Sequence, residues 1–281
     1  RLYSCAYWKV DTKTLEEAQQ NKIDHIIKKL DIKEGQKILE VGCGWGGMAF
    51  EIAKQKKCEI TGISLSKNQI KYCREKAKRL GLDNQVKFEL IDYREAKGHY
   101  DRIYSVGMFE HVGKKFYNTF FKSMNYLLKD NGLFLLHTIG VVDSPSPPNK
   151  FINKYIFPGG ICPSFSQIIS PIEKTGLIVS DAETLIRHYD KTLESWLERF
   201  LDKKNLVKDL FDERFRKITN KHKLKDGDIG IAPVGMNDNF SKDTALIYYK
   251  DIFLAPGLHG LERISVDLVE HFFDIRNIRM K

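Results

Sequence analysis

Short apolar runs alternate with amphipathic segments along the first two thirds of the chain. Runs with the length of buried strands occur at residues 38–41, 59–63, 86–91, 102–106 and 133–138. Segments that repeat apolar positions at the helical period occur at residues 48–54, 66–81 and 116–128. Such alternation predicts a mostly parallel sheet with helices on both faces. We therefore expect an α/β fold that binds its ligand beyond the carboxyl ends of the strands.

Capping signals mark three helix starts. Thr14 with Glu17, Ser66 with Gln69, and Ser164 with Gln167 all have the spacing of a capping box. Later in the chain, residues 177–185 predict a strand and residues 193–211 a helix. Residues 244–254 are the candidate for the closing strand of the sheet. The amphipathic segment 261–278 is left open between a membrane-surface helix, a dimer contact and an atypical terminal element.

The loop after the first strand carries candidate chemistry. Glu40 stands two positions before the G-x-G-x-G of Gly42, Gly44 and Gly46. Glycines let the backbone approach a ligand closely, and a carboxylate can accept hydrogen bonds from an ammonium or hydroxyl group. A dinucleotide site would normally carry G-x-G-x-x-G and an acid about 20 residues later, but here the next strand ends in Ser64-Leu65-Ser66. This pattern favours S-adenosylmethionine over NAD, with another nucleotide fold or a tight structural turn as alternatives.

Composition limits the class of protein. The chain has 281 residues, 42% hydrophobic, which predicts one soluble α/β domain with insertions, without a membrane span or signal peptide. Its five scattered cysteines indicate neither a disulfide framework nor a zinc site, so we expect a cytoplasmic protein without a metal. Basic clusters at 67–79 and 199–225 contribute to a net charge of +9. They indicate an anionic partner or simply solvated helix faces.

A proline-rich stretch interrupts the pattern after residue 140. Prolines and glycines there alternate with aromatic and apolar side chains. This composition predicts a lid or insertion over the strand ends, at residues 141–176, within a single domain spanning 1–281.

Seven separated strings resemble the cyclopropane fatty acid synthases and the related mycolic acid methyltransferases. They occupy residues 3–7, 42–46, 64–69, 109–111, 135–139, 156–160 and 187–193. The resemblance runs from residue 1 to about 216, and the region 217–281 diverges. It implies a class I, Rossmann-like methyltransferase fold with a mostly parallel seven-stranded sheet, helices on both faces, a helical lid that binds the acyl chain, and S-adenosylmethionine as cofactor.

The resemblance also implies the cofactor contacts. The loop contributes Glu40, Gly42, Cys43, Gly44 and Gly46. The matching positions at the methionine end are Tyr3 and Ser4, those at the ribose Ser64, Leu65 and Gln69, and those at the adenine Asp92, Tyr93 and Arg94. Family members commonly have Trp where this chain has Tyr93, and often Thr where it has Ser64. Both differences keep the stacking or hydrogen-bonding character.

The chemistry implied by the resemblance demands a base. Methylating an alkene leaves a carbocation, and ring closure requires a base within reach of the new methyl group. The family uses a bound bicarbonate ion, whose matching contacts here are Cys5, Glu110, His137, the backbone of Ile139, and Tyr189. Each has a structural alternative: a buried thiol, a helix-start carboxylate, a core histidine or simple packing. Candidates for an acyl tunnel are Phe109, Phe151, Tyr155, Ile156, Phe157 and Phe200.

The resulting hypothesis is transfer of a methylene group from S-adenosylmethionine to the cis double bond of an unsaturated fatty acyl phospholipid. We expect peripheral contact with an anionic membrane surface, and the sequence leaves a homodimer open. Two alternatives stay within methyl transfer: a small-molecule N-methyltransferase and an enzyme that forms methyl branches. A nucleic-acid methyltransferase is disfavoured, because the chain has no Asn-Pro-Pro-Tyr string and no basic module interleaved with aromatic residues, so no nucleic-acid partner is expected.

Overall fold

A computed structural model describes most of the first two hundred residues and three later strands. The described residues are 2–141, 145, 147, 153, 157–185, 187–202, 229–233, 245–249 and 268–276. The statements below concern these residues.

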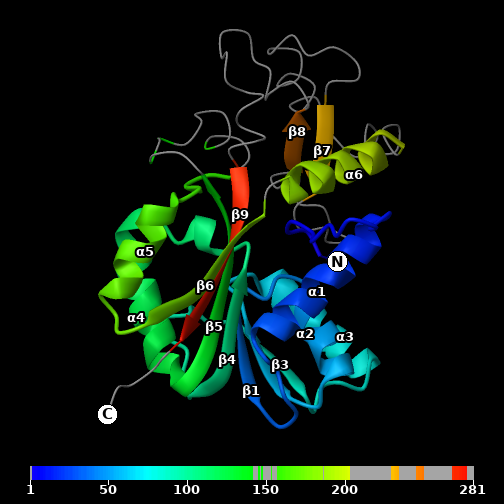
Figure 1. Ribbon diagram of the computed structural model, residues 1–281. Coiled ribbons are helices and arrows are strands. Elements are labelled where there is room, and N and C mark those ends of the chain that lie inside the picture. The colour runs from blue at the N-terminus through cyan, green and yellow to red at the C-terminus, as the bar shows by residue number, and fades with distance from the viewer. Residues whose placement is uncertain are drawn as a thin grey trace.

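One twisted sheet runs through the centre of the molecule (Figure 1). Within the described residues it has seven strands in the order β3-β2-β1-β4-β5-β9-β6. All neighbours are parallel except β9, which is antiparallel to both β5 and β6. The strands are β1 (Lys37–Val41), β2 (Glu59–Ile63), β3 (Val86–Glu89), β4 (Tyr100–Val106), β5 (Leu128–Val141), β6 (Ile178–Leu185) and β9 (Leu268–Arg276). The predicted mostly parallel α/β sheet is confirmed.

Helices cover the two faces of this sheet. Figure 1 shows α1, α2 and α3 on one side and α4 and α5 on the other. Their bounds are α1 (Leu15–Lys29), α2 (Gly47–Gln55), α3 (Lys67–Arg79), α4 (Tyr117–Leu127) and α5 (Phe165–Glu173). Two short 3₁₀ turns, η1 (Phe109–His111) and η2 (Lys114–Phe116), follow β4, and α6 (His188–Asp202) follows β6.

Local sequence explains most of these elements. In β1 the four residues Ile38 to Val41 are all buried, as expected for a central strand covered on both faces. Thr14 and Glu17 form the capping box at the start of α1, and Ser164 and Gln167 form the one at α5. Each face of the sheet then buries its own apolar cluster, one under α1–α3 and one under α4 and α5.

The last strand of the sheet differs from the prediction. Residues 244–254 were the candidate, but β8 (Ala245–Tyr249) pairs only with β7 (Ile229–Pro233), in a separate two-stranded sheet. The sheet is completed by β9, which comes from the segment 261–278 and lies between β5 and β6. Strand pairing joins residues far apart in the chain, so a local apolar pattern predicts a strand without predicting its partner.

Part of the predicted lid belongs to the core. Within 141–176, helix α5 buries Ile168 and Ile172 in the cluster under α4. Residues 157–160 form a turn, in which the Gly160 N–H donates to the Phe157 carbonyl at 2.9 Å. Most of 142–156 lies outside the described residues, and so does the predicted helix beyond Asp202. That residues 141–176 cover the strand ends therefore stays a prediction.

None of the described helices combines the length and the apolar character needed to cross a bilayer.

Candidate functional site

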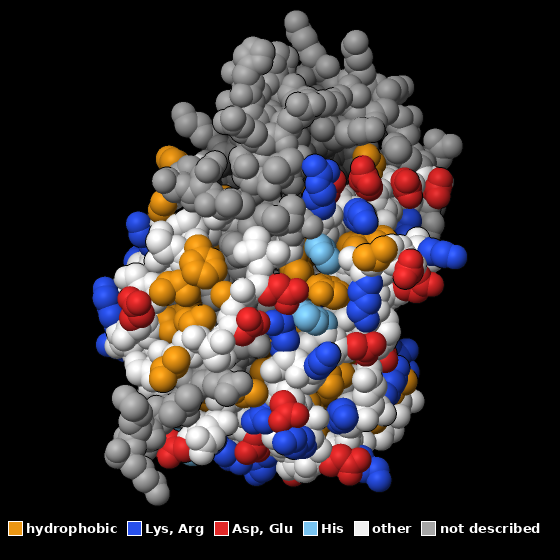
Figure 2. Space-filling model, in the orientation of Figure 1, with side chains coloured by type: hydrophobic (Ala, Val, Ile, Leu, Met, Phe, Trp, Pro, Cys, Tyr) orange, Lys and Arg blue, Asp and Glu red, His pale blue; other side chains and the backbone are white. Residues whose placement is uncertain are grey.

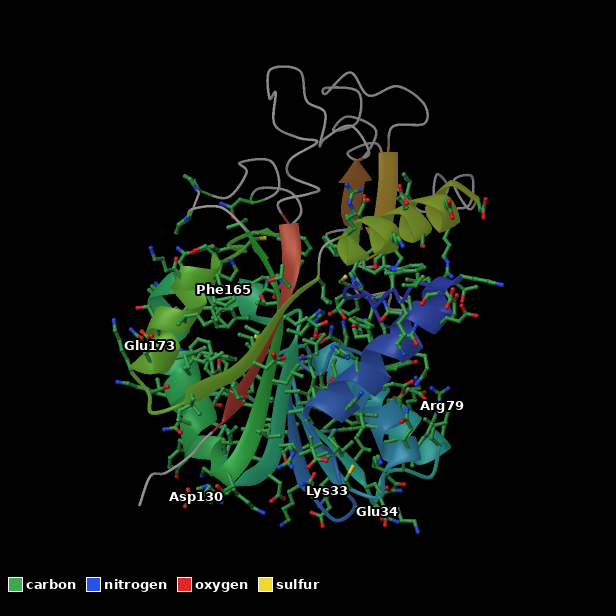
Figure 3. All side chains as sticks on the ribbon, viewed as in Figure 1. Lys33, Glu34, Arg79, Asp130, Phe165 and Glu173 are labelled. Atoms are coloured by element: carbon green, nitrogen blue, oxygen red, sulfur yellow. The ribbon has the colours of Figure 1, made fainter. Side chains whose placement is uncertain are left out.

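The sequence-predicted site residues gather at the carboxyl ends of the strands. In Figure 3, Lys33 and Glu34, which precede β1, and Asp130, which lies near the start of β5, are at the lower end of the sheet. The parallel strands run upward from there and end beside the N-terminal segment. Glu40, Ser64 and His137 lie at or near this upper edge, which is the edge where α/β proteins bind ligands.

Hydrogen bonds and close packing fix one side of the glycine loop, and its other side faces Tyr3. The N–H groups of Gly42 and Cys43 both donate to the Ile63 carbonyl at 3.0 Å. Gly42 has φ +85°, and a Cβ there would lie 2.6 Å from Cγ of Met108. Gly44 has φ +51°, and the nearest atoms to a Cβ there belong to the Tyr3 ring, at 3.5 Å. The side of the loop facing Tyr3 is therefore the side a ligand can approach.

Glu40 is a buried carboxyl at the end of β1. Its exposed fraction is 4%, and Oε2 has no hydrogen-bond partner among the described residues. Burial raises the pKa of Glu40 to about 8, an effect only partly offset by the neighbouring Tyr104 hydroxyl, Ala49 N–H and Lys22 ammonium. A buried oxygen with unused acceptor capacity suits a ligand that brings a hydrogen-bond donor.

The N-terminal segment lies over this loop. Ser4 is fixed by two side chains of α1: Lys22 Nζ donates to its Oγ at 2.6 Å, and Gln19 Nε2 donates to its carbonyl at 2.9 Å. Burial raises the pKa of Tyr3, whose hydroxyl faces Gln69. Gln19 and Lys22 were not among the predicted site residues. Both are buried on the apolar face of α1, so two long polar residues at core positions were the available signal.

The predicted ribose corner forms a local hydrogen-bond network. Ser64 Oγ donates to Gln69 Oε1 at 2.8 Å and accepts from the Ser66 N–H at 3.1 Å. Ser66 caps α3 by accepting from the Gln69 N–H at 3.3 Å. The predicted capping box is therefore only half present, because the Gln69 side chain bonds Ser64 instead of the backbone of Ser66. Leu65 beside them is 71% exposed.

The predicted adenine turn lies apart, next to α4. Arg94 and Asp92 form a two-pronged ion pair, with Nε to Oδ1 at 2.8 Å and Nη2 to Oδ2 at 2.7 Å. The Tyr93 ring packs edge-on against Phe120, with centroids 5.2 Å apart. Hydrogen bonding to Arg94 lowers the pKa of Asp92, which favours the ionised carboxylate.

Glu110 is the second buried carboxyl at this edge. Its Oε1 accepts from the Ile139 N–H at 2.6 Å, whereas Oε2 has no partner in the described part of the chain. Burial raises the pKa of Glu110 to about 7, against the hydrogen bond from Ile139. His137, fully buried two residues before Ile139, accepts from the Gly107 N–H through its carbonyl at 3.0 Å. Glu110, His137 and Ile139 are therefore brought together.

Cys5 and Tyr189 lie on the other side of the same edge. Cys5 is fully buried, and its Sγ lies 3.9 Å from Thr192 Oγ1 of α6. Tyr189, half-buried, lies in the first turn of the same helix. Ser4 links this pair to the other group, because a Cβ on Gly107 would lie 3.4 Å from Ser4 Cβ. The contacts therefore join Glu110 to Ile139, and Cys5 to Thr192 of α6, the helix that carries Tyr189.

The candidate residues for the acyl tunnel differ in where the structure places them. Phe109 is fully buried and stacks on Tyr117, with centroids 4.3 Å apart, so it is part of the core. Phe157 is half-buried, with its ring 5.7 Å from that of His111. Three candidates, Phe151, Tyr155 and Ile156, lie outside the described residues, and so does the side chain of Phe200.

Two further groups near Glu110 were not predicted. Tyr117 is buried, and its hydroxyl lacks a partner among the described residues. Burial, followed by the charge of Glu110, raises the pKa of Cys162 to about 12. Nothing in the local pattern distinguished either residue from core packing. Across the described residues, no cluster of His, Cys, Asp and Glu has the geometry of a metal site.

Comparison with known proteins decides the family. The model of the mycolic acid cyclopropane synthetase family matches residues 1–224. This chain belongs to that family. The cyclopropane-fatty-acyl-phospholipid synthase of Escherichia coli K12 is 44% identical over 216 residues, covering 77% of this chain and 55% of the relative. The methoxy mycolic acid synthase MmaA3 of Mycobacterium tuberculosis is 33% identical over 211 residues, covering 70% and 72%.

A third relative, a probable fatty acid methyltransferase of Pseudomonas putida, is 39% identical over 203 residues, covering 70% of this chain and 52% of that protein. This chain spans about half the length of the bacterial relatives from Escherichia coli and Pseudomonas putida.

Solved structures confirm the fold of this family member. The cyclopropane synthase MmaA2 from Mycobacterium tuberculosis has a TM-score of 0.76 at 25% identity, covering 98% of this chain and 89% of that one. The mycolic acid cyclopropane synthase CmaA1, complexed with SAH and CTAB, has a TM-score of 0.76 at 26% identity over the same shares. The predicted class I methyltransferase fold is confirmed.

Proposed function

We propose that this protein transfers the methyl carbon of S-adenosylmethionine to the cis double bond of an unsaturated fatty acyl phospholipid and closes a cyclopropane ring. The observation that carries the proposal is the buried Glu110 carboxyl, whose Oε1 is bonded by the Ile139 N–H and whose Oε2 has no hydrogen-bond partner among the described residues. Besides burial, the charges of Glu110 and Glu40 raise the pKa of Tyr3, whose ring borders Gly44 of the glycine loop. The name of the Escherichia coli relative supports the acyl phospholipid substrate.

The residues of the glycine loop fit S-adenosylmethionine. Glu40 Oε2 has no hydrogen-bond partner among the described residues, and the atoms nearest to a Cβ on Gly44 belong to the Tyr3 ring, at 3.5 Å. Tyr3 and Ser4 would hold the methionine end of the cofactor, and Ser64 and Gln69 would hold the ribose. Tyr93 would contact the adenine, and Cys43 and Leu65 would lie beside the bound cofactor. When bound, the cofactor supplies an electrophilic methyl group on a positively charged sulfur.

The reaction needs a proton acceptor that does not itself attack the substrate. The net change forms two carbon–carbon bonds, breaks one carbon–sulfur bond and releases one proton from the transferred methyl group. Glu110, His137, Cys5 and Tyr189 fit a small oxyanion such as bicarbonate, which would supply the base there. A thiol and a phenol can donate to an oxyanion, and an ionised Glu110 can accept from its hydroxyl.

Ile139 has a more specific task than binding the anion. Its N–H donates to Glu110 Oε1 and thereby fixes the orientation of the carboxyl group. Because the pKa of Glu110 is raised to about 7, this carboxyl exchanges its proton near neutral pH. A carboxyl poised in this way can pass on the proton that the reaction releases.

Contact with an anionic membrane surface is part of the proposal. Lys67, Lys71, Lys78 and Arg79 are exposed along α3. Clustered cations of this kind are attracted to anionic head groups. In Figure 2, acidic and basic side chains intermix on the right of the view, and hydrophobic side chains gather on the left.

The decisive experiment offers the purified protein vesicles of phosphatidylglycerol or cardiolipin with oleoyl chains, together with S-adenosylmethionine and bicarbonate. We expect a lipid mass increase of one CH2 and upfield cyclopropane proton signals in NMR spectra. A product with the same mass but without those signals would favour a methyl branch, the alternative that the Pseudomonas putida relative supports. No mass increase in any vesicle would contradict acyl transfer.

A small-molecule N-methyltransferase is tested by two variants. Transfer to an amine needs no group to deprotonate the methyl carbon, so Cys5→Ala and Tyr189→Phe would both leave such an activity intact. We expect both variants to lose methylene transfer to lipid while they still bind S-adenosylhomocysteine.

A further inference from the structure

Thr192 is a fully buried hydroxyl at which the N-terminal segment meets helix α6. Its Oγ1 accepts hydrogen bonds from the Ala6 N–H at 3.1 Å and from Trp8 Nε1 at 3.0 Å. It donates to the His188 carbonyl at 2.7 Å, one turn earlier in α6. A hydroxyl has one hydrogen and two lone pairs, so Thr192 is fully used by these three bonds.

The position of Cys5 follows from this arrangement. Cys5 precedes Ala6, and its Sγ lies 3.9 Å from Thr192 Oγ1. Its Sγ also donates to the Ala6 carbonyl at 3.3 Å. Tyr189 lies on the same helix, immediately after His188. A single side chain thus joins the segment that carries Cys5 to the helix that carries Tyr189.

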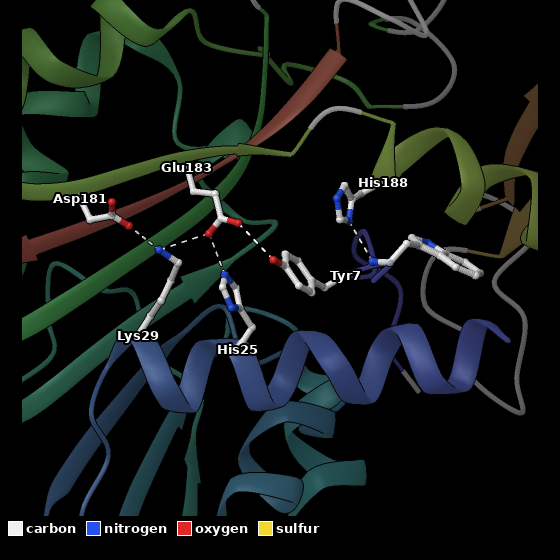
Figure 4. A network of polar contacts seen from close by, with 7 residues as sticks. Tyr7, His25, Lys29, Asp181, Glu183 and His188 are labelled. Atoms are coloured by element: carbon white, nitrogen blue, oxygen red, sulfur yellow. Dashed lines mark hydrogen bonds and ion pairs between the residues drawn. The ribbon is translucent and has the colours of Figure 1, made fainter. Parts of the chain in front are cut away.

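A second anchor holds the same segment against β6. Glu183 Oε1 accepts from the Tyr7 hydroxyl at 3.3 Å, and Glu183 Oε2 lies 2.7 Å from His25 Nε2 and 3.2 Å from Lys29 Nζ. Asp181 also pairs with Lys29. Figure 4 shows these groups between α1 and β6. The Tyr7 ring stacks on His25, with centroids 4.3 Å apart.

The two anchors meet at His188. Its Nδ1 accepts from the Trp8 N–H at 2.8 Å, and its ring lies 5.0 Å from that of Tyr7. Figure 4 shows His188 directed from the start of α6 toward the N-terminal segment. Residues 5–8 are therefore held by side chains from three elements, α1, β6 and α6, together with one bond from the Tyr7 N–H to the Ala18 carbonyl of α1 at 3.0 Å.

We propose that Thr192 and Glu183 are positioning residues, which hold residues 5–8 so that the Cys5 thiol faces the same space as Tyr189. The catalytic consequence of this positioning rests on the proposed function, whereas the positioning of Cys5 itself does not. Thr192 acts directly on the Cys5 segment, and Glu183 acts through Tyr7.

The test measures how accessible the Cys5 thiol is to alkylation, in the absence of substrate. Thiol alkylation by N-ethylmaleimide, followed by peptide mass spectrometry, reports the accessibility of Cys5 separately from that of the other cysteines. Thr192→Val leaves two buried N–H donors without an acceptor, so we expect alkylation of Cys5 to accelerate at least about tenfold. Thr192→Ser restores the hydroxyl, and we expect a rate within about twofold of the wild type.

Three further variants keep the test decisive. Ser195→Ala is the matched control, because Ser195 Oγ donates to the Lys191 carbonyl at 2.9 Å in the same helix without touching residues 5–8. Ser195→Ala should leave the alkylation rate of Cys5 unchanged. Trp8→Phe removes only the indole donor, and it replaces Thr192→Val if that variant does not fold. Glu183→Gln should give a smaller acceleration, since Thr192 still holds Ala6.

Kinetics on oleoyl phospholipid vesicles complete the experiment. We expect Thr192→Val to lower kcat at least about tenfold with little change in KM, with recovery in Thr192→Ser. Unchanged Cys5 protection in Thr192→Val and Trp8→Phe would overturn the proposal. Accelerated alkylation in a protein whose wild type transfers no methylene group would support the holding of Cys5 while contradicting the proposed function.

Discussion

The two halves of the site are built over very different lengths of chain. The glycine-loop half comprises residues 40–46 and 64–69, which belong to two successive strands and the turns that follow them. Ser64 and Gln69 are five residues apart, and the Gly42 N–H bonds the carbonyl of Ile63 at the end of the next strand. The Glu110 half comprises Cys5, Glu110, His137, Ile139 and Tyr189. Its contacts join Glu110 to Ile139, 29 residues on, and Cys5 to Thr192, 187 residues on.

This difference has a physical consequence. Short-range contacts are formed by a strand, a turn and a helix that follow one another, so the glycine-loop half is built together with the sheet. The Glu110 half needs the N-terminal segment to lie on α1 and α6 to lie on that segment. Changes in the first half should therefore affect stability and cofactor binding, and changes in the second should affect the chemical step.

The largest expected effect is on stability in the glycine-loop half. Gly42→Ala places a methyl group 2.6 Å from Met108 Cγ at a φ of +85°, and we expect it to lower the free energy of unfolding by about 3 kcal/mol. Gly35→Ala is the matched control, with φ +75° and no atom within 4 Å of its Cβ, and should cost about 1 kcal/mol. Urea denaturation measures both. Equal losses would mean that the contact with Met108 is unimportant.

The two buried carboxyls sharpen the contrast directly. Glu110→Gln keeps the shape of the side chain and removes its charge, and we expect kcat to fall about 100-fold or more with cofactor affinity retained. Glu40→Gln should instead weaken S-adenosylmethionine binding. Calorimetric titration and initial rates separate the two effects. If Glu40→Gln changed only kcat and Glu110→Gln only affinity, the assignment of the two halves would be reversed.

The pH dependence of stability tests the burial of Glu40. Its pKa is raised from 4.5 to about 8, so the folded state favours the protonated carboxyl. This contribution is fully present below pH 4.5 and is lost as the pH rises to about 8, by roughly 1.4 kcal/mol per pH unit at most. In Glu40→Gln that loss should disappear from denaturation curves between pH 5 and about 8. A cationic ligand favours the ionised form, so wild-type affinity for S-adenosylmethionine should rise over the same range.

The smallest expected effect concerns His188. Burial lowers its pKa below 6.5, so the neutral ring that accepts from Trp8 is favoured in the folded state. Charged groups facing it are Glu183, Lys191 and His25. Its stabilising contribution is present above pH 6.5 and is lost as the pH falls through the folded pKa. Amide exchange of Trp8, corrected for the intrinsic rate, should accelerate in acid. His188→Asn cannot titrate and should remove this dependence.

Agreement between sequence and structure follows the same division. The capping boxes at Thr14 and Ser164 were predicted correctly, because a cap involves residues three apart. The box at Ser66 was only half right, because Ser64 competes for the Gln69 side chain. The closing strand was wrong: β9 lies between β5 and β6, and no local pattern specifies such partners.

Among the site residues, those of the glycine loop could be predicted from seven consecutive positions. The other site residues were predicted from the family resemblance. The roles of Lys22 and Thr192 could not be predicted. Lys22 is a polar residue at a core position, which is visible in the helical pattern of α1, but its partner Ser4 is not. Thr192 lies in an ordinary helical segment, and the two hydrogen bonds that it accepts from Ala6 and Trp8 appear only when residues 5–8 pack against α6.

By itself the sequence determined the alternation of strands and helices, the turn at the glycine loop and the residue types available for chemistry, because these depend on local periodicity and backbone freedom. Only the tertiary structure decided which strand completes the sheet, which oxygen of Glu110 is occupied, and what holds Cys5 beside α6. Burial and long-range hydrogen bonding produce those features, and both come into existence when distant segments pack together.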